Sequence, residues 1–216
     1  MPTSHARTER AALAELLREL GPDAPTLCEG WTTRDLAAHL VVREHRPDTG
    51  PGIMLKPFAG WTEKVRRKQA AKPYEQSVRR FADGPPRLSP FGIPGVDAAA
   101  NTMEYFIHLE DVRRAQPGGA APRELPADLV EILWKRARSG SRMLLRGVPV
   151  GVALRRTDTG RDEPTVTVHK GAPEVVLSGA PAELLLYLFG RKARADVEAS
   201  GDAAAIATLR EARTGL

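Results

Sequence analysis

The chain has 216 residues, with 32 basic and 27 acidic side chains and a formal net charge of +5. Apolar residues make up 42 % and charged residues 27 % of the sequence, which is ordinary globular composition and argues against a disordered chain. Cys28 is the one cysteine, which excludes a disulfide within the chain and a four-cysteine zinc site. The length predicts one large domain or two small ones.

The sequence predicts a cytoplasmic protein without a membrane partner. Charged side chains interrupt the first twenty residues, so no signal-peptide core is present there. The longest strongly apolar run, Leu184 to Phe189, is too short to span a bilayer. A single cysteine is also typical of a reducing compartment.

The first 146 residues show the patterns of helices. Four leucines at the spacing of one buried stripe predict a helix over residues 4–20, which ends at the Gly-Pro that follows. Thr32 followed by Asp35 is the pattern of a capping box and predicts a second helix that ends before Pro47. Further helices are predicted at 61–70, 73–83, 96–116 and from Pro126 onward, separated by Pro- and Gly-rich loops at 47–60 and 84–95.

The pattern changes near residue 148. Short β-type runs occur at 150–154, 165–168 and 174–177, and they are separated by Gly, Pro and Asp. An apolar helix at 181–189, a last strand at 195–199 and a helix at 202–213 complete the chain. The predicted fold class is therefore α+β, with a helical bundle over residues 1–146 and a small α+β domain over residues 147–216.

One segment of the predicted 96–116 helix carries metal-ligand chemistry. Glu104 and His108 are one turn apart and share a helix face, so both side chains can reach the same cation. Asp111, three residues after His108, lies on the same side of the predicted helix. His39, which is surrounded by apolar residues in the second helix, is the best candidate for a third ligand. The alternatives are an ordinary surface pair for Glu104 and His108 and a hydrogen-bonded core position for His39.

A site with two imidazoles and one carboxylate leaves coordination positions open for water or substrate, which is the pattern of a catalytic site. Zn²⁺ is the usual ion for these ligands, and Ni²⁺, Fe²⁺ and Mn²⁺ are alternatives. Asp111 could hold the free ring nitrogen of a ligand histidine. Arg43, one turn after His39, could bind a carboxylate at the same pocket. Cys28 is either a small buried side chain or a fourth ligand.

The positive charge is concentrated in residues 62–80, which hold seven basic and two acidic side chains. Such a stretch is either an anion-binding patch or a solvated helix face. It contains no interleaved aromatics or groove-reading motif, so we expect no nucleic-acid partner.

Three segments also resemble a known family. They are Trp31–Leu40 (WTTRDLAAHL), Glu104–Asp111, and the tail Leu177–Arg191 with the later Gly201-Asp202. Their order and sequences resemble those of the mycothiol-dependent maleylpyruvate isomerase family, which belongs to the DinB-like metal-binding bundles. The resemblance implies an actinobacterial member of that family. The resemblance covers nearly the whole chain and implies a four-helix bundle with a divalent metal, usually zinc, on His39, Glu104 and His108.

The resemblance further implies mycothiol, a low-molecular-weight thiol, as cosubstrate and an isomerase or S-transferase reaction on an electrophilic or acidic small molecule. An arginine of the C-terminal domain takes part in the isomerase, and Arg191 is our candidate for it. We expect a monomer or a homodimer. The segments 62–80 and 84–95 depart from the isomerase, which leaves the substrate open. A non-catalytic metal- or ligand-binding protein on the same scaffold is the alternative function.

Overall fold

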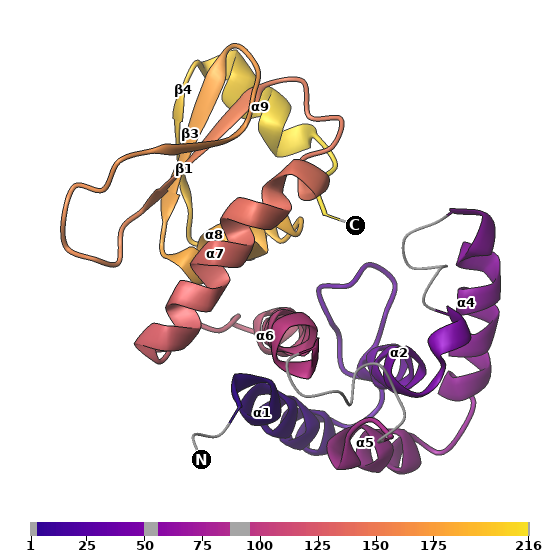
Figure 1. Ribbon diagram of the computed structural model, residues 1–216. Helices are drawn as coiled ribbons and strands as arrows, with labels where there is room; N and C mark the ends of the chain where they lie inside the picture. Colours follow the sequence, from indigo (N-terminus) through magenta and orange to yellow (C-terminus); the bar gives the residue numbers. More distant parts are fainter. Residues whose placement is uncertain (1–3, 50–55, 87–95, 216) are drawn as a thin grey trace. The chain divides into compact units, whose positions relative to one another are not determined.

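The computed structural model describes residues 4–49, 56–86 and 96–215. The chain forms two compact units, residues 1–121 and residues 122–216 (Figure 1). This division differs from the predicted boundary at residue 146, because helix α7 (Ala127–Leu144) packs on α8 (Pro181–Leu188) and on strand β2 (Val166–His169). The apolar stripe of α7 predicts a buried helix, but it does not indicate which core buries it.

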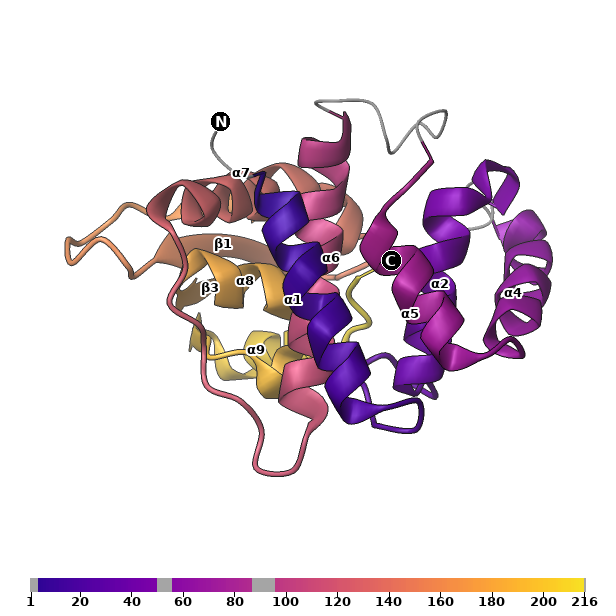
Figure 2. The same ribbon diagram turned by 90° about the horizontal axis from the view of Figure 1, so that it is seen from below.

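The core of the first unit comes from four of its described helices, α1, α2, α5 and α6, in line with the four-helix bundle that the resemblance implies. Helix α1 packs on α5 and α6, and α2 packs on α5 and on the additional helix α4; Figures 1 and 2 both show α1 beside α6. The bounds are α1 (His5–Leu20), α2 (Thr33–His45), α4 (Lys56–Ala70), α5 (Tyr74–Asp83) and α6 (Val96–Ala115), with a short 3₁₀ turn η1 (Pro47–Thr49) after α2. Helix α4 begins inside the predicted 47–60 loop, and most of the predicted 84–95 loop lies outside the described residues.

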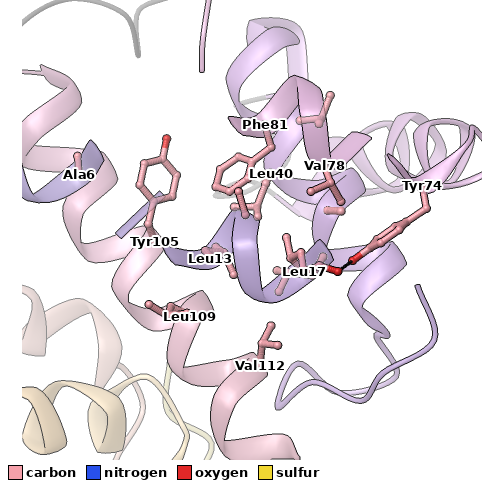
Figure 3. Close-up of a cluster of buried hydrophobic side chains, with 14 residues drawn as sticks. Ala6, Leu13, Leu17, Leu40, Tyr74, Val78, Phe81, Tyr105, Leu109 and Val112 are labelled. Atoms are coloured by element: carbon pink, nitrogen blue, oxygen red, sulfur yellow. Dashed lines mark hydrogen bonds between the residues drawn. The ribbon is translucent and has the colours of Figure 1, made fainter. Parts of the chain in front are cut away.

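The core of this bundle is apolar and tightly packed (Figure 3). Leu13, Leu17 and Phe81 are fully buried. The ring of Phe81 meets the edge of Tyr105 at a centroid distance of 5.4 Å. The hydroxyl of Tyr74 donates a hydrogen bond to the Leu17 carbonyl at 2.7 Å, so the one polar atom of that ring is satisfied.

A buried polar network joins three helices of the bundle. The Arg10 guanidinium of α1 donates to Glu44 of α2 at 3.3 Å and to the hydroxyl of Tyr105 on α6. The Tyr105 hydroxyl in turn donates to the Glu44 carboxylate. Glu44 and Tyr105 are both fully buried. Because these hydrogen bonds are directional, the network restricts how α1, α2 and α6 can slide along one another.

The second unit is a mixed four-stranded sheet in the order β2-β1-β3-β4, with β1 antiparallel to β2 and parallel to β3. Helix α8 packs on β3, and α9 (Ala203–Glu211) packs on β3 and β4. The remaining elements are β1 (Gly151–Arg156), β3 (Glu174–Gly179), the 3₁₀ turn η3 (Lys192–Arg194) and β4 (Glu198–Gly201). The last strand lies slightly later than the predicted 195–199.

Two glycines allow the chain to pass from β2 to β3 across the start of β1. A Cβ added at Gly151 would lie 2.3 Å from the Gly171 carbonyl oxygen, and one added at Gly171 would lie 2.6 Å from the Gly151 nitrogen. No larger residue fits at either position without moving the backbone.

Among the described residues, no helix is both long enough and apolar enough to cross a membrane.

Candidate metal centre

Two polar stripes face each other across the apolar interior of the first unit. On α6, Asn101, Glu104, His108 and Asp111 are spaced three or four residues apart and therefore lie on one face. On α2, His39 and Arg43 are one turn apart. The packing of α2 and α6 around the shared core brings the two stripes together and makes a single cluster.

Three ligand atoms converge in this cluster. His39 Nε2 lies 3.1 Å from Glu104 Oε1, and His108 Nε2 lies 3.3 Å from the same oxygen. All three atoms lie within 4.8 Å of one another. The rings of His39 and His108 meet edge to face, with centroids 5.3 Å apart.

These distances fit a metal ion. Ligand atoms bound tetrahedrally at about 2.0–2.2 Å from one ion stand about 3.3–3.6 Å apart, which is close to the observed spacing. Two imidazole nitrogens and one carboxylate oxygen are also a donor set that suits zinc. The side chains of His39, Glu104 and His108 are 19 %, 23 % and 12 % exposed, so the cluster is shielded but remains reachable for a further ligand.

Asp111 determines which nitrogen of His108 faces this cluster. Asp111 Oδ2 lies 3.0 Å from His108 Nδ1, and the carboxylate is fully buried. A proton on Nδ1 satisfies this contact and leaves the lone pair of Nε2 directed at Glu104. The structure thus places Asp111 where the sequence predicts a residue that orients a ligand histidine.

Cys28 lies behind His108 rather than with the three ligand atoms. Its thiol donates to Asp111 Oδ2 at 3.2 Å, and its sulfur is 3.9 Å from His108 Nδ1. Cys28, His108 and Asp111 could form a metal-binding group of their own. That group would need Nδ1 of His108 without its proton, whereas the first group uses the free Nε2. We therefore assign Cys28 to the support of Asp111.

The charges in the cluster follow from its contacts. Burial raises the pKa of Glu104, but hydrogen bonds from His108 and His39 and the positive charge of Arg43 hold that pKa well below 4.5. Burial lowers the pKa of His39 below 6.5, in spite of its hydrogen bond to Glu104. Burial alone would also lower the pKa of His108, but Asp111, Cys28 and Glu104 together raise it well above 6.5.

Arg43 lies in the cluster, as expected from its spacing. Its Nε is 3.3 Å from Glu104 Oε1, and its guanidinium also donates to the Asn101 side chain. The Arg43 side chain is 9 % exposed. A shielded guanidinium beside the three ligand atoms is suited to attract an anionic ligand, and its binding of a carboxylate stays a prediction.

The structure adds two residues that the sequence did not indicate for the site. The ring of Trp31 packs on His39 at a centroid distance of 5.2 Å, and the Arg66 guanidinium lies 4.8 Å from the centre of the Trp31 ring. Arg66 is itself held by Asp35 of α2 and by Glu63 of α4. The contact of His39 with Trp31 and the contact of Trp31 with Arg66 therefore connect the site to α4. No periodicity in the sequence relates these three positions.

Other candidate residues lie elsewhere. The ring of His45 contacts the Val41 carbonyl on its own helix. Of the basic residues in segment 62–80, Arg66 is buried and ion-paired, whereas Arg67 is 75 % exposed on α4. Arg191 belongs to the second unit, where its guanidinium donates to the Phe189 carbonyl at 2.6 Å. Its catalytic role stays a prediction.

The fold and the cluster together define a class: an α+β protein whose helical bundle carries a candidate His-Glu-His metal centre. Residues 4–47 match the family model of the mycothiol maleylpyruvate isomerase N-terminal domain. This segment includes His39 and Arg43. This match supports the resemblance to the mycothiol-dependent maleylpyruvate isomerase family over residues 4–47.

Solved structures confirm the fold. A crystal structure of the mycothiol-dependent maleylpyruvate isomerase is similar over 91 % of this chain and 90 % of its own, with a TM-score of 0.58 and 19 % sequence identity. A histidine-to-alanine mutant of that isomerase matches over the same shares, with a TM-score of 0.62 and 18 % identity. A search of the curated proteins found no significant match.

Proposed function

We propose that the protein binds a divalent metal ion, preferably zinc, on His39, Glu104 and His108, and uses it with mycothiol in an isomerase or S-transferase reaction. The convergence of His39 Nε2, Glu104 Oε1 and His108 Nε2 carries this proposal. The N-terminal domain match supports the thiol as cosubstrate, because the family is named for its dependence on mycothiol.

The metal would supply one kind of chemistry: a bound cation lowers the pKa of a thiol that ligates it, so that the thiolate exists near neutral pH. The thiolate is the nucleophile that an electrophilic carbon requires. In an S-transfer, the thiolate displaces a leaving group, which departs with the electron pair of its bond to carbon, and the new carbon–sulfur bond remains. In an isomerisation, the thiolate adds to a carbon–carbon double bond, the resulting single bond rotates, and the same thiolate leaves.

The side chains around the ligands have separate tasks in this proposal. Asp111 holds the Nδ1 proton of His108 and thereby keeps Nε2 available. Arg43 places a positive charge beside Glu104, where it would attract a carboxylate of the thiol or of the substrate. Trp31 covers one side of His39 and limits the access of water to that ring.

Metal content tests the first part of the proposal. We expect about one equivalent of zinc in protein purified without a metal-affinity tag, measured by elemental analysis. His39→Ala and His108→Ala should reduce it to background, because each removes one of three ligands. His45→Ala is the matched control on helix α2, since that ring lies outside the cluster. Equal metal content in all four proteins would contradict the site.

Turnover tests the second part. Metal-loaded protein should consume maleylpyruvate or a model electrophile when mycothiol is present and should not do so without the thiol. His108→Ala should abolish this activity, and His45→Ala should leave it unchanged. Stoichiometric metal without thiol-dependent turnover would favour the alternative, a non-catalytic metal-binding protein on the same scaffold.

A further inference from the structure

The second unit contains an open groove that the proposed metal chemistry does not use. It lies between helix α7 and strand β2 and has a volume of about 730 Å³. Trp134, Lys135 and Arg138 line it from α7, and Val166, Thr167 and Val168 line it from β2. We call it the α7–β2 groove.

One wall of the groove is the edge of the sheet. Strand β2 is the first in the order β2-β1-β3-β4, so within the described residues only β1 pairs with it. The backbone N–H and C=O groups on its outer side are therefore available to another extended segment. A groove between a helix and an edge strand is the arrangement in which a peptide adds to a sheet as a further strand.

The other wall carries positive charge. Lys135 and Arg138 are three residues apart on α7, so they share one face, and both are exposed. In the part of the chain that the structure describes, neither forms an ion pair. The one acidic lining residue, Glu131, is bound to the Arg156 guanidinium at 2.7 Å. The groove therefore presents two uncompensated cations to a ligand.

Trp134 adds an apolar and aromatic surface to the groove. The residue is only 8 % exposed, and the guanidinium groups of Arg138 and Arg156 lie 5.8 Å and 5.6 Å from its ring centre. The contacts fix the ring and hold Arg138 close to the groove. Apolar side chains of a ligand can pack on the parts of Trp134, Val166 and Val168 that line the groove.

From these observations we propose that the α7–β2 groove binds an extended peptide segment of a partner protein that carries acidic side chains at alternate positions. The segment would pair with the free edge of β2 through its backbone. Alternate side chains of a strand point to the same side, so every second residue of the segment would face α7. Acidic residues at these positions would meet Lys135 and Arg138. This inference is independent of the metal centre.

Three synthetic peptides test the proposal on the full chain. The first is a fluorescent, acetylated and amidated peptide of alternating aspartate and valine. The second replaces aspartate by lysine, and the third keeps aspartate but is N-methylated at alternate residues, so that it cannot donate to a strand edge. We expect saturable binding of the first peptide, with at least tenfold weaker binding of the other two, measured by fluorescence anisotropy.

Protein variants locate the binding. The double substitution Lys135→Gln and Arg138→Gln should weaken binding of the aspartate peptide about fivefold, since exposed ion pairs are screened by water and each contributes only modestly. Arg142→Gln is the control, because it removes a positive charge from α7 outside the groove. In a protein labelled with ¹⁵N, the aspartate peptide should shift the amide signals of residues 166–168.

Equal binding of the lysine peptide would overturn the charge selection. Equal binding of the N-methylated peptide would show that strand addition does not occur. An equal loss of affinity in Arg142→Gln, or no saturable binding of the aspartate peptide at millimolar concentration, would also overturn the proposal.

Discussion

The protonation of His108 determines how tightly the site can hold a metal at a given pH. Its contacts with Asp111, Cys28 and Glu104 raise the pKa of the ring well above 6.5, so a proton on Nε2 competes with a metal ion for that nitrogen. Metal binding must release that proton. The pKa values of His39 and Glu104 are both lowered. Neither group therefore contributes to the proton release near neutral pH.

We therefore predict that metal affinity rises with pH. Below the raised pKa of His108, the affinity should increase about tenfold per pH unit, because one proton is released for each ion bound. Above that pKa it should reach a plateau. Isothermal titration calorimetry in buffers of different ionisation enthalpy measures both the affinity and the proton release.

Asp111→Asn is the companion test. The amide oxygen can still accept the Nδ1 hydrogen bond, but the negative charge that raises the pKa of His108 is lost. The plateau should therefore begin at a lower pH and lie about tenfold or more below the wild-type affinity, because a less basic ring is a weaker ligand. A pH-independent affinity between pH 6 and 8 in the wild type would contradict the assignment of His108.

Tyr105 supports a second residue-scale prediction. Tyr105→Phe removes the hydroxyl that joins Arg10 to Glu44 in the buried network, and it leaves both charged groups with one hydrogen bond fewer. We expect a loss of about 1–3 kcal/mol in the free energy of unfolding, measured by urea denaturation.

Tyr187→Phe is the control for Tyr105→Phe. Tyr187 is also buried, but its hydroxyl has no hydrogen-bond partner among the described residues. Its removal should leave stability unchanged or raise it slightly. An equal loss of unfolding free energy in Tyr105→Phe and Tyr187→Phe would show that the hydrogen bonds of the network do not stabilise the protein.

At the scale of elements, helix α4 supports the candidate metal site through packing and supplies none of its three candidate ligands. The side chain of Arg66 reaches from α4 to the Trp31 ring, which in turn packs on His39. Asp35 of α2 and Glu63 of α4 hold the guanidinium in place. The basic segment 62–80 is therefore not uniform, because one of its charges is part of the packing around the site.

Arg66→Met should weaken metal binding about fivefold, because a partly desolvated cation–π contact contributes about 1 kcal/mol and its loss frees Trp31 and His39 to move. Arg67→Met is the control, since Arg67 binds the same Glu63 but points to solvent. Competition with a chromophoric chelator gives both affinities. Unchanged affinity in Arg66→Met would assign the contact to stability alone.

At the scale of the whole molecule, the three candidate ligands belong to one unit and the candidate arginine to the other. His39, Glu104 and His108 all lie within residues 1–121, whereas Arg191 lies within residues 122–216. The candidate metal ligands and the candidate arginine thus come from different units of the chain.

We predict that a fragment of residues 1–121 folds and binds the metal within about threefold of the affinity of the full chain, because no ligand is removed. The same fragment should lack turnover if Arg191 takes part. Circular dichroism checks its helical content, and the chelator competition checks its affinity. A helical fragment without metal affinity would show that the second unit completes the site.

The sequence by itself determined the order and nature of most elements. Apolar spacing is a local property, so the stripes of α1 and α7 and the short runs of β1 and β3 are visible in the chain. It also determined that Glu104, His108 and Asp111 share one helix face, because residues three and four apart are neighbours on any α-helix. The loop boundaries near α4 and the position of β4 were less accurate, since the ends of elements depend on neighbouring contacts.

Only the tertiary structure decided which faces meet. His39 is 65 positions from Glu104, and Cys28 is 83 positions from Asp111; their contacts depend on how the helices and the preceding loop pack. The cation–π contact between Arg66 and Trp31 also depends on this packing. So does the position of α7 in the second unit rather than in the first. Helix periodicity shows that a face is buried or polar, but the partner of that face depends on the packing of the entire core.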